Sequence, residues 1–139
     1  MTIFIFSFLT MKAIQRQITG YTGVFFAAGK LGLRNLVVSL TWGGYPDVDV
    51  VALNPQNDKR VSIQVKSHSA RNSWYPLSLG KSDFYVFVDI SRERIDYSIM
   101  PTTLVRSMAT KNLLSWQKSH PNEKYPWLDA EQVEEHREK

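Results

Sequence analysis

The sequence predicts a mixed α/β fold of the α+β kind, in which helices flank a mixed central sheet. A segment with an apolar helical stripe comes first, five short β-branched or apolar runs follow, and a second helical pattern comes after them. Helices before and after a series of strands are typical of layers in which helices cover a sheet. The chain has 139 residues, the length of one domain, and is long enough to bury a hydrophobic core.

The first helix is predicted to begin near Thr19 or Thr22 and to end between Gly32 and Asn35, although its glycines leave both boundaries open. The second is predicted to begin near Pro101, with a threonine as its cap, and to run to about Ser119. A nearly continuous apolar run at 83–90 is typical of a central strand buried on both faces. The predicted strands are 36–42, 48–53, 60–67, 83–90 and 94–101.

The two ends of the chain differ in composition from its middle. We assign residues 1–11 to an apolar extension, 12–120 to the core domain and 121–139 to a charged tail that is either a short helix or frayed. The first ten residues are too short to span a bilayer and lack a signal-like positive region, so we expect a cytoplasmic protein with no membrane partner. Met11 could be the natural start. Alternatively, the extension is an edge strand or a contact in a homodimer.

Composition limits the chemistry. The chain has no cysteine, which excludes disulfides and thiolate metal sites, and its three histidines lack zinc-ligand spacing. No Asp or Glu precedes Asp47, so the net charge of +4 comes from the four basic residues of the first third. A basic face of this kind can attract phosphate, and the alternative is a solvated helix face.

Asp49, Gln64 and Lys66 form the constellation that could carry chemistry. Asp49 opens one predicted strand, and Gln64 and Lys66 stand two residues apart on the next, which places both on one face. Carboxylate and amide oxygens suit Mg²⁺, and a cation can stabilise charge in phosphodiester hydrolysis. The alternative is an ordinary hairpin in which Asp49 caps a strand, Gln64 pairs across the sheet and Lys66 extends to water.

The stretches "PDVDVVAL" and "IQVKS" resemble the PD-(D/E)xK nuclease superfamily. They are most similar to a small resolvase-like and homing-endonuclease-like branch whose motif contains Gln-x-Lys. The likeness includes "VVSLTWGG" and "DFYVFVDI" and spans most of residues 20–108. It implies a restriction-endonuclease-like αβββαβ core and DNA cleavage with Mg²⁺ or Mn²⁺, often by a dimer. Asp49, Gln64 and Lys66 match the catalytic positions. The implied metal ligands are Asp49, Gln64, the Val65 carbonyl and, as second choice, Asp47.

One departure from the family bears on activity. The family often carries a Glu on its first helix, where this chain has Val24, and Gln64 is neutral, so we expect a weak metal site or none. Three functions stay open: a metal-dependent DNA endonuclease, an inactive nuclease-fold protein that binds DNA, and an oligomeric interaction module. The residues expected to face DNA are Lys12, Arg16, Lys30, Ser67, His68 and Arg71, although each could instead be an ordinary surface residue.

Overall fold

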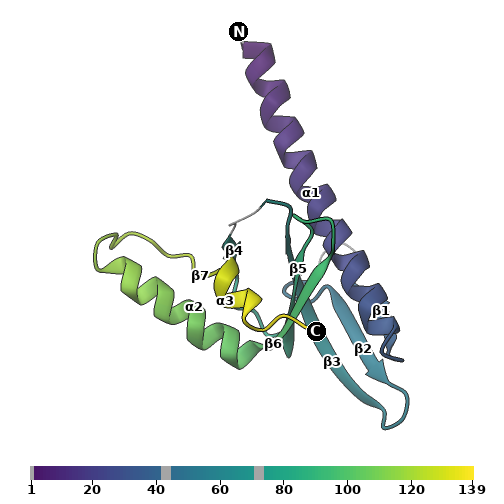
Figure 1. Cartoon of the computed structure of the whole chain (residues 1–139). Coiled ribbons are helices and arrows are strands. Elements are labelled where there is room, and N and C mark those ends of the chain that lie inside the picture. The colour runs from purple at the N-terminus through teal and green to yellow at the C-terminus, as the bar shows by residue number, and fades with distance from the viewer. Residues whose placement is uncertain (1, 42–44, 71–73) are drawn as a thin grey trace.

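The computed structural model describes the backbone of residues 2–41, 45–70 and 74–139, and the side chains of the same ranges from Met11 onward. Its elements fall in the order helix, strands, helix, as the sequence predicts (Figure 1). They are α1 (Thr2–Gly32), β1 (Val37–Leu40), β2 (Val50–Asn54), β3 (Lys59–His68), β4 (Trp74–Pro76), β5 (Phe84–Asp89), β6 (Asp96–Pro101), α2 (Thr102–Gln117), β7 (Trp127–Asp129) and α3 (Ala130–Glu134).

The main sheet has five strands in the order β1-β2-β3-β5-β6. Strands β1, β2 and β3 form an antiparallel meander, β5 runs parallel to β3, and β6 returns antiparallel to β5. The mixed sheet and its flanking helices confirm the predicted fold class. The predicted strands at 48–53, 60–67, 83–90 and 94–101 agree with β2, β3, β5 and β6 to within two residues. Trp42, at the predicted end of the first strand, lies outside the described residues.

Two hydrophobic layers form on opposite faces of the sheet. Helix α1 packs on one face, against alternate residues of the strands such as Val65 and Val86. On the other face, Tyr85 and Phe87 pack with residues of α2 and of the β4–β7 ribbon, and α3 adds Val133 (Figure 1). Strand β5 is therefore buried on both faces, which explains its continuous apolar sequence.

Helix α1 is longer than the sequence predicts, since it begins at Thr2 rather than near Thr19 or Thr22. The strand alternative for the first ten residues is therefore wrong. The error came from taking Thr19 or Thr22 as the helix start, whereas both threonines lie inside the helix. Gly23 lies inside the helix, directly against Ser67 of β3. A Cβ at this position would collide with Ser67, so the missing side chain lets the helix pack close to the strand. The first half of α1 projects past the body of the protein (Figure 1).

The crossover from β3 to β5 differs from the expected αβββαβ order. In its described residues it holds the short strand β4 and no helix. Strand β4 pairs with β7 in a two-stranded ribbon that the sequence did not predict, because three-residue strands carry almost no periodic signal. Of the two expected anchors of this crossover, Tyr75 is buried, whereas Trp74 is 58% exposed.

The C-terminal part of the chain packs onto the α2 side of the sheet. The N-cap of α2 is Pro101 and not the predicted threonine. Its side chain therefore makes no capping hydrogen bond to the helix. The last twenty residues contain the short helix α3, one of the two predicted alternatives, which begins with a capping box formed by Asp129 and Gln132. Leu128 and Val133 lie in the core. Among the described residues, no helix combines the length and the apolar character needed to cross a membrane.

Candidate active site

Asp49, Gln64 and Lys66 come together where β2 begins and β3 continues past it. The Asp49 amide donates to the Ile63 carbonyl at 2.9 Å, which places Asp49 beside Gln64. Gln64 and Lys66 are register partners of Tyr85 and Phe87, both of which belong to the core on the α2 side. Their side chains therefore lie on the face opposite α1, since successive residues of a strand point to opposite faces.

The carboxylate of Asp49 is fixed by the backbone of β3. Its Oδ2 accepts the Val65 N–H at 2.7 Å. Strand β2 begins only at Val50, so this donor lies just beyond the antiparallel pairing, and the carboxylate satisfies it. Within the described residues, the other oxygen, Oδ1, accepts no hydrogen bond. Asp49 therefore has a structural role and an oxygen that remains open to a ligand.

Asp47 lies at the same end of β2 and is held by the crossover. Its backbone has a φ of 65°, a conformation that Asp tolerates better than most residues, and its Oδ1 accepts the Ser78 hydroxyl at 3.0 Å. Ser78 in turn accepts the Gln64 Nε2 at 3.3 Å. A Cβ at Gly80 would collide with the Asp47 side chain, so only glycine fits there. Arg106 of α2 braces this loop by donating to the Leu79 and Gly80 carbonyls, both at 3.1 Å.

Lys66 is half-buried beside these two carboxylates. Burial lowers the pKa of Lys66 below its ordinary 10.5, and Asp49 and then Asp47 partly counter this effect. The carboxylates act from beyond ion-pair range, because within the described residues no carboxylate oxygen lies within 4.0 Å of the ammonium. A lysine with a lowered pKa gives up its proton more readily than a solvated one, so Lys66 is suited to proton transfer as well as to charge stabilisation.

Gln64 contributes an orphaned acceptor to the site. The side chain is only 7% exposed, and its Oε1 is buried without a hydrogen-bond partner in the described part of the chain. The hydroxyl of its register partner Tyr85 is also buried, and a hydrogen bond from the Gly80 backbone partly offsets the rise that burial causes in its pKa. Buried polar atoms are satisfied in nearly all native structures, so the Gln64 oxygen is the acceptor in this site that still lacks a contact.

The donor set fits a hard divalent cation in ligand type but is low in charge. Asp49 and Asp47 supply carboxylate oxygens, and Gln64 supplies an amide oxygen, all of which suit Mg²⁺. Throughout the described side chains, however, no three His, Asp or Glu residues gather closely enough to form a metal-binding group. Metal binding, including the role expected for the Val65 carbonyl, therefore stays a prediction.

Helix α1 reaches the back of β3 close to this site but brings no acid. The Ser67 hydroxyl donates to the Thr19 carbonyl at 2.9 Å, at the point where Gly23 also contacts β3. Val24 packs at the edge of the apolar layer between α1 and the sheet. The position at which the resemblance implies a Glu therefore carries a partly buried apolar side chain.

Of the six residues expected to face DNA, the five that the structure describes do not form one surface. Lys12 and Arg16 are exposed on the projecting half of α1, and the Lys30 ammonium lies over the Tyr97 ring, 5.1 Å from its centroid, beside β6. Ser67 is engaged by α1, and His68 ends β3 with 8% exposure, so it is not the exposed loop histidine considered as the alternative. Arg71 lies outside the described residues.

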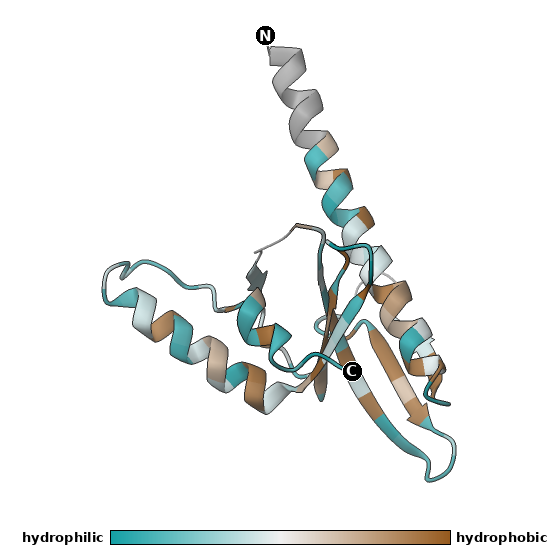
Figure 2. Ribbon diagram, in the orientation of Figure 1, coloured by the Kyte–Doolittle hydropathy of each residue, from teal (hydrophilic) through white to brown (hydrophobic). Residues whose placement is uncertain are grey.

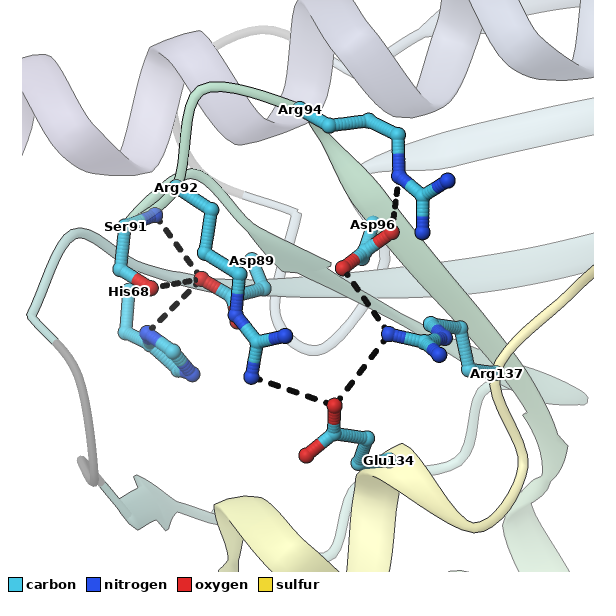
Figure 3. Close-up of polar contacts among 8 residues, drawn as sticks. All are labelled: His68, Asp89, Ser91, Arg92, Arg94, Asp96, Glu134 and Arg137. Atoms are coloured by element: carbon cyan, nitrogen blue, oxygen red, sulfur yellow. Dashed lines mark hydrogen bonds and ion pairs between the residues drawn. The ribbon is translucent and has the colours of Figure 1, made fainter.

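A second polar cluster lies further along the same face of β3 (Figure 3). His68 Nδ1 is 3.6 Å from Asp89 Oδ1, and its ring packs against Tyr75. Ion pairs continue from Asp89 to Arg92 at 3.8 Å and from Arg92 to Glu134 of α3 at 3.1 Å. They border a cleft of about 510 Å³. Two further arginines extend this His68 cluster, in the pairs Glu134–Arg137, Asp96–Arg137 and Asp96–Arg94.

Sequence reasoning missed two sets of residues. Ser78, Gly80 and Arg106 support Asp47 from the crossover and from α2, and the serine and glycine looked like ordinary loop residues. The His68 cluster is spread from β3 to the C-terminus, so no local spacing marks it.

Comparison with known proteins gives the chain no relatives. No family model matches it, and neither a curated protein nor a solved structure does. The case for a function therefore rests on the geometry of its own residues.

Proposed function

We propose that this protein is a divalent-metal-dependent DNA endonuclease of the PD-(D/E)xK type. One observation carries the proposal. The carboxylates of Asp49 and Asp47, the orphaned Gln64 oxygen and the half-buried Lys66 meet at one place on the sheet, and both carboxylates influence the pKa of Lys66. An ordinary hairpin would leave Lys66 extended into water and Gln64 paired, so the hairpin alternative explains these features less well.

Each residue has a distinct role in this proposal. Asp49 and Gln64 would hold Mg²⁺ or Mn²⁺ through Oδ1 and Oε1, with Asp47 as a further ligand, and the bound metal supplies charge neutralisation at the phosphate. The Val65 amide keeps Asp49 in place through its other oxygen. Lys66, whose pKa burial lowers, stabilises developing negative charge or transfers a proton at Nζ.

The topology supports a restriction-endonuclease-like core without requiring it. A helix precedes a three-stranded antiparallel meander, and the next main-sheet strand runs parallel to the third. The crossover contains β4 in its described part where that core would carry a helix. This difference makes the candidate site, rather than the fold, the stronger support for the proposal.

The proposal is tested by assaying supercoiled, linear and branched DNA with Mg²⁺ and with Mn²⁺. Asp49→Asn removes the charge but keeps an oxygen for the Val65 amide, so it should abolish cleavage and leave the fold intact. Asp58→Asn makes the same chemical change in the exposed β2–β3 turn and should cut like the wild type. Cleavage that survives Asp49→Asn, or none by the wild type on any of these substrates, contradicts the proposal.

A second candidate function is DNA binding without cleavage. The low carboxylate count favours it, because α1 contains no acid and the described side chains form no metal-binding group of three. Calorimetric titration with Mn²⁺ separates the two functions. Binding that Asp49→Asn abolishes supports the enzyme. Absence of metal binding, together with DNA affinity that falls steeply as salt rises, supports the binding protein.

A further inference from the structure

We propose that α1 is a dimerisation helix that pairs, through the side facing away from the sheet, with the same helix of a second copy of this chain. Figure 2 shows hydrophobic and hydrophilic residues alternating along α1, the first half of which projects beyond the body of the protein. The inference concerns assembly and holds whether or not the protein cleaves DNA.

A row of apolar residues follows one side of α1, and we call it the α1 stripe. Its members are separated by three and four residues in turn, which is the heptad spacing of a coiled-coil seam. All are large and well exposed: Met11 63%, Ile14 44%, Ile18 51%, Tyr21 55% and Phe25 54%. Single exposed apolar residues are common, but a row in heptad register indicates a surface that another helix covers.

The sheet does not cover the α1 stripe, because α1 uses its other side to pack on the strands. Gly23 lies against Ser67, and Ala27 and Leu31 are 0% and 5% exposed in the apolar layer. At about 100° per residue, these positions lie nearly opposite the stripe on the helix. The helix therefore has two apolar sides, and the apolar layer on the sheet uses the side opposite the stripe.

The residues that border the α1 stripe favour an identical partner. Gln15, Gln17 and Thr22 occupy the flanking heptad positions, and all three are uncharged. Lys12 and Arg16 lie on the side away from the stripe, so two copies can approach without facing like charges. An acidic partner or an anionic bilayer would instead be matched by basic residues along the border.

The available surface approaches what a stable pair requires. About half of each of five large side chains is open, or roughly 100 Å² apiece, which gives about 500 Å² per copy. The stems of the bordering glutamines add to this, toward the roughly 800 Å² per partner of a standard interface. With 31 residues, α1 is about 46 Å long, so its length does not limit a seam of this size.

The decisive experiment measures the mass of the full chain in solution by light scattering. Ile18→Glu places a charge in the stripe, and Arg16→Glu makes the same change on the other side of the same helix. We expect dimers for the wild type and for Arg16→Glu, and a monomer with unchanged circular dichroism for Ile18→Glu. A monomeric wild type, or a dimer that survives Ile18→Glu, overturns the proposal.

Cross-linking tests the surface directly, because the chain has no cysteine. Ile18→Cys should form a disulfide-linked dimer on mild oxidation, and Arg16→Cys should form far less. Equal cross-linking of the two variants contradicts pairing through the stripe. A monomer that binds anionic phospholipid vesicles through Ile18 would assign the stripe to a lipid surface and would likewise overturn the proposal.

Discussion

Strand β3 carries two polar clusters on the same face, and they differ in how far their groups are satisfied. In the His68 cluster, Asp89, Asp96 and Glu134 each have at least one arginine within 4.0 Å (Figure 3). Around Lys66, in contrast, the carboxylates lie beyond ion-pair range of the ammonium. Each cluster holds a buried atom without a hydrogen bond, Gln64 Oε1 in one and His68 Nδ1 in the other. Both clusters are built largely from charged side chains, so composition alone does not distinguish them.

The difference concerns unpaired charge rather than space, because the cleft of about 510 Å³ lies at the His68 cluster. The ion pairs of the His68 cluster connect α3 to the sheet, and their energy contributes to holding the C-terminus in place. The Lys66 site leaves a lysine with a lowered pKa and an open carboxylate oxygen, which is a costly arrangement in a purely structural role. We therefore expect changes in the two clusters to affect different measurements.

The largest expected effect is on cleavage. Lys66→Ala should lower the cleavage rate by about 100-fold or more, the usual contribution of an acid–base group. Arg92→Ala, in the His68 cluster, should leave the rate within a few-fold of the wild type. Initial rates on plasmid DNA with Mn²⁺ measure both variants. Similar losses in the two would show that the clusters do not have separate functions.

The next effect is steric. Gly80→Ala places a Cβ against the Asp47 side chain, so we expect a loss of about 1–3 kcal/mol of unfolding free energy together with reduced cleavage. Gly29→Ala is the control, since a Cβ there meets nothing within 4 Å, and it should stabilise α1 by about 0.5–1 kcal/mol. Urea unfolding measures both changes. A Gly80→Ala protein as stable and active as the wild type would mean that the position of Asp47 is unimportant.

The His68 cluster should make stability depend on pH. Burial lowers the pKa of His68 below its ordinary 6.5, an effect that Asp89 opposes and Arg92 reinforces. The unfolded chain therefore binds this proton more readily, so stability is highest above pH 6.5 and declines as the pH falls below it. Urea midpoints between pH 7 and 5 should fall less in His68→Phe than in the wild type. A slope in His68→Phe as steep as in the wild type would mean that His68 does not cause the pH dependence.

The smallest effect is expected from a single ion pair. Glu134→Gln removes the charge that Arg92 and Arg137 share, and should cost about 0.2–1 kcal/mol, less in high salt. Glu135→Gln alters an exposed neighbour with no ion pair among the described residues, and should have no measurable effect. Thermal unfolding at two salt concentrations measures both. A larger loss that salt does not reduce would mean that Glu134 does more than pair with these arginines.

The sequence predicted the main sheet well because its signals are local. The alternation of Val61, Ile63 and Val65 indicated β3, because a strand with one apolar face alternates apolar and polar residues. The apolar run before Ile90 indicated β5, because a strand buried on both faces is apolar throughout. The expected clustering of Asp49, Gln64 and Lys66 on one face also depends only on strand order and on a two-residue period. Whether these residues act as a site stays a prediction.

What the sequence did not predict depends on contacts between distant segments. The role of Gly23 becomes clear only once Ser67 is known to lie against it, so its sequence signal suggested a helix boundary. Ser78 and Gly80 acquire a role only because Asp47 folds back onto them. The β4–β7 ribbon joins segments more than fifty residues apart, and neither segment is long enough to show a period.

The parallel pairing of β3 with β5 has a consequence for protein synthesis. The β1–β3 meander can form as soon as it leaves the ribosome, but the loop that fixes Asp47 and the strand that pairs with Gln64 emerge later. Parallel partners separated by a long connection pair slowly, because the intervening loop must close first. A nascent chain ending before Ser78 would therefore have Asp49 held by Val65, but Asp47 and Gln64 would lack the hydroxyl that links them. Any activity of this site would begin only after most of the domain had been made.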